Sequence, residues 1–141
     1  MSIESQSPRV GSIKKIVIKT AEHGLENNEC LKFQICRKDP LNKRFPTSSE
    51  CCEASDICAI NNQFQAGSIE TIKGSALNLC NRYELPTVAF LELTGIQGEG
   101  CWKGDFIEIV LNNSKNIRCH NVKDQKICGR NERLKYRCQT K

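Results

Sequence analysis

The fold is decided by the stretch Leu31-Lys32-Phe33-Gln34-Ile35-Cys36, in which apolar and polar side chains alternate with a period of two residues. Successive side chains of a β-strand point to opposite faces of a sheet, so this alternation predicts a strand with one buried and one solvated face. Its three apolar residues would share the core face. Cys30 and Cys36 would lie on the opposite face, and we expect them to meet partners outside the main core.

Other stretches along the chain also have the composition of strands, because they are rich in β-branched and apolar residues and are bounded by polar turns. They are residues 13–20, 68–73, 87–94, 106–112, 116–120 and 134–138. A short helix is favoured only at 75–80. Strands 87–94 and 106–112 are apolar on both faces, so we expect the cysteine-rich segment 121–141 to cover the outer surface of the sheet. Many short strands separated by turns predict an all-β sandwich.

Cysteine usage places the protein in an oxidising compartment. The chain has 141 residues, which fits one domain, and ten cysteines, an even number that suits pairing. They are Cys30, Cys36, Cys51, Cys52, Cys58, Cys80, Cys101, Cys119, Cys128 and Cys138. The short Cys-x(2–4)-Cys knuckles of zinc sites are missing, and the two histidines are isolated in the sequence. We therefore expect five disulfides, no metal, no cofactor, and secretion to the extracellular space.

The disulfide pairing is left open, since ten cysteines allow about 945 arrangements. Adjacent cysteines rarely bond to each other, so we expect Cys51 and Cys52 to tie their loop to two different places. The domain is expected to span residues 13–141 after a flexible leader at 1–12. Within it, the irregular stretch around 39–63 would be a long loop pinned by disulfides.

Charge is unevenly distributed along the chain. The net charge is +5, and the residues from Lys115 onward carry nine basic and two acidic side chains, a net of +7, which leaves −2 for the remainder. A basic tail favours an anionic partner, or is simply a solvated surface. It has no interleaved aromatic residues, so we expect no specific nucleic acid. The sequon that begins at Asn112 predicts N-glycosylation.

Four stretches, taken in order, resemble a PLAT/LH2 domain, the β-sandwich module of lipoxygenases and lipases. Residues 15–20 are similar to its opening strand, and 64–72 to its Phe-x-x-Gly-Ser-x-Asp-x-Phe stretch, with Glu70 in the place of the Asp. Residues 90–93 followed by 101–109 resemble its Trp-x-x-Asp-x-Val-x-Val strand, and 117–120 its Phe-x-Cys-Asn ending. The likeness covers roughly residues 14–120.

The resemblance implies an eight-stranded antiparallel sandwich with two additions, a disulfide-pinned long loop and a C-terminal extension at 121–141. It also implies a non-enzymatic module that binds a membrane lipid surface or an extracellular protein. A secreted effector or toxin acting on a host or prey protein is the alternative. Family members that bind calcium use acidic loop residues, whereas the matching loops here hold four scattered glutamates, Glu22, Glu26, Glu29 and Glu99.

Contact residues are expected at loop tips, because loops on a rigid scaffold carry recognition. Leu25 and Ile96 are apolar residues in otherwise polar tips, and Trp102, which packs near the end of the sandwich in the resembling family, is the third candidate. A small secreted ribonuclease is the alternative from another class. It would require His23 and His120 to converge on a phosphate, with Lys19 nearby.

Overall fold

The computed structural model describes residues 9–26, 29–38, 50–54, 56–59, 63–97, 101–121, 125–128 and 132–140. These residues form strands and one short 3₁₀ helix, η2 (Gly74–Cys80). The strands are β1 (Arg9–Thr20), β2 (Cys30–Cys36), β3 (Cys51–Glu53), β4 (Ile57–Cys58), β5 (Ile69–Lys73), β6 (Glu84–Pro86), β7 (Val88–Gln97), β8 (Cys101–Trp102), β9 (Gly104–Leu111), β10 (Asn116–Asn121), β11 (Ile127–Cys128) and β12 (Arg133–Thr140). The predicted all-β class is confirmed.

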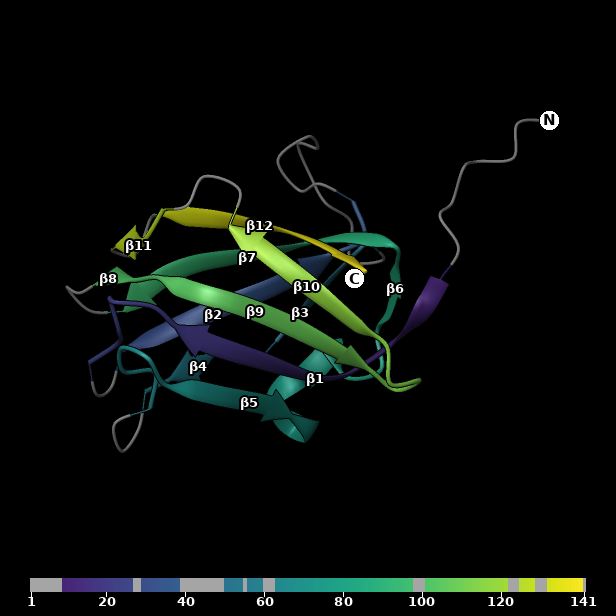
Figure 1. The fold of residues 1–141 in the computed structure, drawn as a ribbon, viewed down its shortest axis with the longest axis horizontal. Helices are drawn as coiled ribbons and strands as arrows, with labels where there is room; N and C mark the ends of the chain where they lie inside the picture. The colour runs from purple at the N-terminus through teal and green to yellow at the C-terminus, as the bar shows by residue number, and fades with distance from the viewer. Residues whose placement is uncertain are drawn as a thin grey trace.

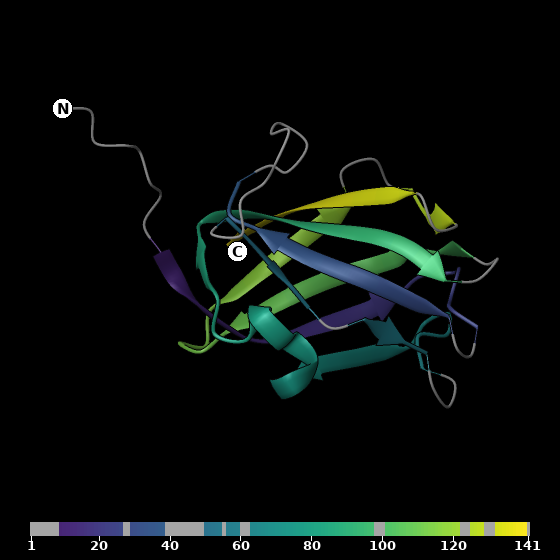
Figure 2. The same ribbon diagram turned by 180° about the vertical axis from the view of Figure 1, so that it is seen from behind.

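Most of the strands belong to one antiparallel sheet, in the order β3-β2-β7-β12-β10-β9-β1-β5. Strand β4 pairs with β2, and β6 pairs with β1, so the described residues place ten strands in this sheet. Strands β8 and β11 form a separate pair. The sheet curls, so that β1 and β9 lie in front of β2 and β7 in the view of Figure 1 and behind them in Figure 2. The expected eight strands are exceeded because β3, β4 and β6, each two or three residues long, add to the edges.

The core lies on the concave side of the curled sheet, where the alternation in the sequence places apolar side chains. The three apolar residues of β2 are fully buried, as are the inward residues of β7 and β9. They form one continuous hydrophobic cluster with the inward residues of β1. The alternation within 31–36 therefore predicts both the strand and its buried face correctly.

The seven predicted strands all occur, with ends that differ by a few residues. The largest difference is in β1, which begins at Arg9. Residues 9–12, assigned above to the leader, pair with β6, and Arg9 opposes Pro86. The assignment fails because Val10 and its neighbours carry no apolar alternation, and their pairing depends on a strand that follows much later in the chain. Residues 1–8 lie outside the described part.

The C-terminal segment does not cover the outer face of the sheet as expected. It enters the sheet as β12, between β7 and β10. The reason is its own alternation, which buries Leu134, Tyr136 and Cys138 in the core. The outer apolar residues stay half-buried beneath cationic side chains: the Arg118 guanidinium lies 4.4 Å from the ring centroid of Phe106.

Five disulfides link all ten cysteines: Cys30–Cys58, Cys36–Cys51, Cys52–Cys80, Cys101–Cys128 and Cys119–Cys138. The prediction of five disulfides is confirmed, and so is the separate attachment of Cys51 and Cys52. Cys30 and Cys36 do not belong to the core cluster, although Cys36 is fully buried. The pairing indicates an oxidising environment. Within the described ranges, no helix is long and apolar enough to cross a bilayer.

Candidate functional site

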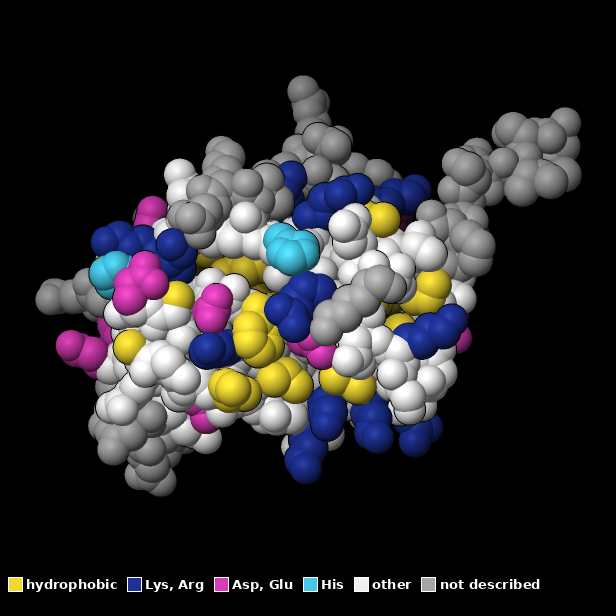
Figure 3. Space-filling model, in the orientation of Figure 1, with side chains coloured by type: hydrophobic (Ala, Val, Ile, Leu, Met, Phe, Trp, Pro, Cys, Tyr) yellow, Lys and Arg dark blue, Asp and Glu magenta, His cyan; other side chains and the backbone are white. Residues whose placement is uncertain are grey.

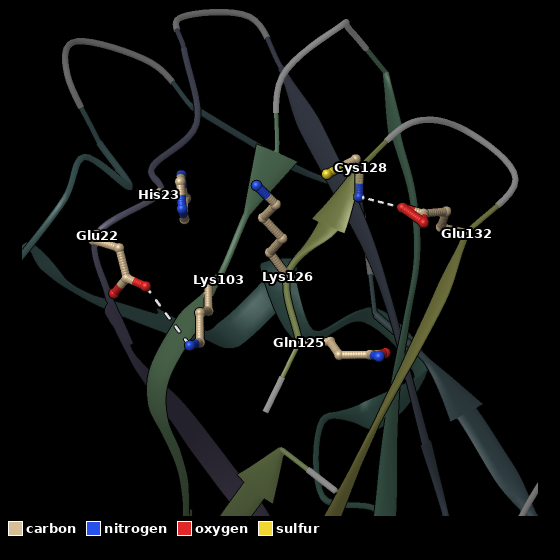
Figure 4. A pocket seen from close by; sticks show the side chains of 7 residues that line it. All are labelled: Glu22, His23, Lys103, Gln125, Lys126, Cys128 and Glu132. Atoms are coloured by element: carbon tan, nitrogen blue, oxygen red, sulfur yellow. Dashed lines mark hydrogen bonds and ion pairs between the residues drawn. The ribbon is translucent and has the colours of Figure 1, made fainter. Parts of the chain in front are cut away.

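A polar pocket opens at the end of the sheet where β1 finishes, with a volume of about 530 Å³. Three separate chain segments build it: the turn after β1, the bend between β8 and β9, and the residues around β11. Its lining side chains are charged or polar apart from one disulfide, and they are Glu22, His23, Lys103, Gln125, Lys126, Cys128 and Glu132. We call this site the polar pocket (Figure 4).

Backbone hydrogen bonds hold one wall of the polar pocket. The amide of Ala21 donates to the carbonyl of Lys103 at 2.8 Å, and the amide of Lys103 donates to the carbonyl of His23 at 3.0 Å. These bonds continue the pairing of β1 with β9 beyond the end of the strands. They fix Glu22 and His23 beside Lys103 without using any of the three side chains.

The opposite wall is attached covalently. Cys128 of β11 is joined to Cys101 of β8, and the two strands pair antiparallel. The amide of Cys128 donates to the Glu132 carboxylate at 2.8 Å. The disulfide therefore holds the segment that carries Lys126 and Glu132 against the first wall.

The polar pocket is lined by two lysines and two glutamates, of which Lys103 and Glu22 form an ion pair. Lys103 Nζ lies 3.6 Å from Glu22 Oε1. A backbone hydrogen bond to Glu22, followed by the positive charge of Lys103, lowers the pKa of this carboxyl, so Glu22 is ionised at neutral pH. Figure 4 shows Lys126 extending from the β11 side toward the side that carries His23 and Lys103. Such an arrangement suits the binding of a polar or acidic group.

Two of the predicted contact residues are buried. Leu25 is 4% exposed and belongs to the core cluster, and its amide donates to the carbonyl of Phe64 at 2.8 Å. The cause is a close approach of two turns: a Cβ placed on Gly24 would lie 2.6 Å from the Phe64 carbonyl oxygen. The turn after β1 is thereby folded against residues 63–68, and the expectation that Leu25 projects from a loop tip is corrected.

Trp102 is also a core residue, with no exposed surface. Its indole Nε1 donates to Thr20 Oγ1 at 3.1 Å. This corrects its place among the contact residues and agrees with the core packing that the family resemblance implies. Ile96 belongs to β7, not to a loop, and its side chain lies outside what the structure describes.

The residues expected for the alternative ribonuclease site are not brought together. His23 lines the polar pocket, whereas His120 lies on β10 opposite Arg137, and Figure 3 shows the two histidines at separate places on the surface. Lys19 pairs with Asp105 at 3.4 Å. Among the described residues, no three His, Cys, Asp or Glu side chains gather into a metal-binding group.

Other expected positions are placed as follows. Glu29 accepts a hydrogen bond from the amide of Glu26 at 2.7 Å, a contact within its own turn, and Glu99 lies outside the described residues.

Asn112 is exposed in the turn after β9, and its side-chain amide donates to Ser12 Oγ at 2.7 Å. Its glycosylation stays a prediction.

Sequence reasoning missed Lys103, Gln125, Lys126 and Glu132. The signal that could have found them is the pairing of Cys101 with Cys128, because the neighbours of two joined cysteines must lie close together. No known family model matches the chain, and no curated protein is significantly similar to it.

Proposed function

We propose that this protein is a secreted, non-enzymatic binding module that recognises an extracellular protein through the polar pocket. The observation that carries the proposal is the construction of that pocket. Exposed charged groups from three chain segments meet on a frame fixed by a disulfide and by strand-like hydrogen bonds. Because the backbone frame is already held in place, binding requires only the side chains, and not the loops, to become ordered.

A protein partner is favoured over a membrane surface by the burial of the apolar candidates. Leu25 and Trp102 are buried and cannot enter a lipid layer in this conformation. The side chains that line the pocket are mostly polar, and the exposed Lys126 can pair with a carboxylate of a partner. Charged and polar contacts of this type set specificity at protein interfaces.

We also propose that the curled sheet is a β-sandwich related to PLAT/LH2 domains. Support comes from the elements that carry the sequence resemblance. The tryptophan of the Trp-Lys-Gly-Asp stretch ends β8 and packs in the core, and the following strand β9 lies beside β1, which contains the opening stretch. A stand-alone module of this fold would use its loop end for recognition and not for catalysis.

The test is a binding measurement with the disulfide-intact chain against a panel of secreted proteins and receptor ectodomains. We expect His23→Ala combined with Lys126→Ala to weaken binding to any partner found by about tenfold or more, since the pair removes two contact groups. Lys14→Ala, an exposed lysine of β1 outside the pocket, is the matched control and should bind as the wild type does.

The wild-type chain and its variants should also be incubated with RNA, and we expect no hydrolysis. Two outcomes would contradict the proposal. One is a partner that binds the double variant as tightly as the wild type. The other is RNA cleavage that disappears in His23→Ala or His120→Ala, which would establish the enzyme instead.

A further inference from the structure

Strand β12 presents a row of positive charges. Its buried residues are Leu134, Tyr136 and Cys138, so the alternate residues Arg133, Lys135 and Arg137 share the outer face of the sheet. Successive residues on one face of a strand are about 6.6–6.8 Å apart, so the row spans roughly 13 Å. We call these three residues the cationic ladder.

The neighbouring strand β10 adds one arginine and one histidine to the same face. His120 lies directly opposite Arg137, and Arg118 lies opposite Gln139. Adjacent strands are about 4.8 Å apart, so the side chains of the two strands form one continuous surface. A surface of this kind can contact an extended ligand at several points at once.

In the described part of this face, the Arg and Lys side chains outnumber the carboxylates. The Arg133 side chain is 68% exposed, and Arg137 and His120 are exposed as well. Two carboxylates oppose the row: Glu92 Oε1 lies 3.8 Å from Arg133, and Glu108 Oε2 lies 2.8 Å from Arg118. Among the described residues, the four Arg and Lys side chains on the outer faces of β10 and β12, set against Glu92 of β7 and Glu108 of β9, leave a net charge of +2.

The side chains on this face favour some classes of polyanion over others. Single-stranded nucleic acid needs open aromatic faces for base stacking. Here the two outer phenylalanines are half-buried and each has a cation over its ring, Arg118 at 4.4 Å from the Phe106 centroid and Lys135 at 5.8 Å from the Phe90 centroid. A guanidinium, by contrast, binds a tetrahedral oxyanion through two parallel hydrogen bonds, and the ladder presents two of them.

An anionic lipid surface is also less well matched, because lasting attachment needs apolar groups that enter the membrane as well as charge. The large apolar side chains that are most exposed in the described part of the chain are Ile69 and Leu79. They belong to β5 and η2 and not to the strands of the ladder.

We propose that the cationic ladder, together with Arg118 and His120, is a binding site for a linear sulfated polysaccharide. The strand spacing presents a guanidinium or ammonium group every two residues along a straight line, and a linear chain with repeating sulfates is complementary to it. The inference rests on the proposed function in placing the protein outside the cell. It concerns a different surface, since no residue of the ladder lines the polar pocket.

The experiment uses the full disulfide-intact chain and heparin as the probe. We expect Lys135→Gln combined with Arg137→Gln to bind immobilised heparin about tenfold more weakly at equal salt than the wild type. The slope of log affinity against log salt concentration should become less negative by about one to two, because the two lost ion contacts no longer release counterions. The matched control, Lys14→Gln with Lys73→Gln, removes the same charge from exposed positions on β1 and β5 and should change both quantities much less.

Equal losses in the two double variants would overturn the proposal, since they would show attraction by net charge alone. Tighter binding to single-stranded RNA or to phosphatidylserine vesicles than to heparin, lost in the ladder variant, would overturn it in favour of that ligand. The His23→Ala, Lys126→Ala variant should keep its heparin affinity. A wild-type chain that binds a protein partner but not heparin would contradict only the ladder proposal. A wild-type chain that binds heparin but no protein partner would contradict only the pocket proposal.

Discussion

Replacing Trp102 with alanine is expected to lower the free energy of unfolding by about 3–5 kcal/mol, the range for truncating a large buried aromatic side chain. Trp102 is fully buried, and its indole ring fills the space beside Gly104. A Cβ placed on Gly104 would lie 2.7 Å from the indole Cη2 and 2.7 Å from the Tyr136 hydroxyl oxygen. The cavity left by alanine has rigid walls, so it cannot collapse easily, and the loss should lie at the upper end of the range.

Trp102→Phe is the control that separates packing from hydrogen bonding. It keeps an aromatic ring but removes the Nε1 donor, so Thr20 Oγ1 loses its 3.1 Å partner. We expect a smaller loss, about 1–3 kcal/mol, measured by guanidinium denaturation of the oxidised protein. Near-wild-type stability of Trp102→Ala would contradict the core placement and restore Trp102 as a surface contact residue.

The parts of the fold that the sequence predicts are those encoded locally. Strands such as β2 and β9 are long enough for alternation to be visible, and their buried faces follow from it. Strands β4, β8 and β11 have two residues each, too few to show any period. They exist because a disulfide or a neighbouring strand holds them. The residues that do so lie far away in the sequence, so a local pattern cannot reveal these strands.

The candidate site depends on the same long-range information. The segment around Leu25 has the composition of an exposed loop tip. Leu25 is nevertheless buried, because Gly24 approaches the backbone of residues 63–68 closely. The pocket wall that carries Lys126 depends on one pairing among the many that ten cysteines allow. Local pattern therefore identifies the scaffold, whereas the site follows only when cross-links between distant segments are known.

Two disulfides of equal loop length allow a direct test of what the cross-links contribute. Cys30–Cys58 and Cys52–Cys80 both have a sequence separation of 28. If each acts by restricting the unfolded chain, either is worth about 3–4 kcal/mol. They differ in burial, since Cys52 and Cys80 belong to the core cluster and the other two cysteines do not.

Double alanine replacement of Cys52 and Cys80 should therefore cost more than that of Cys30 and Cys58. We expect a difference of about 1–2 kcal/mol, because removing two buried sulfur atoms leaves a cavity where β3 meets η2. Unfolding of both variants in guanidinium measures it. Equal losses would mean that chain restriction accounts for the whole effect. A larger loss in the Cys30, Cys58 variant would show that β4, which that disulfide holds against β2, matters more to the core than its two residues suggest.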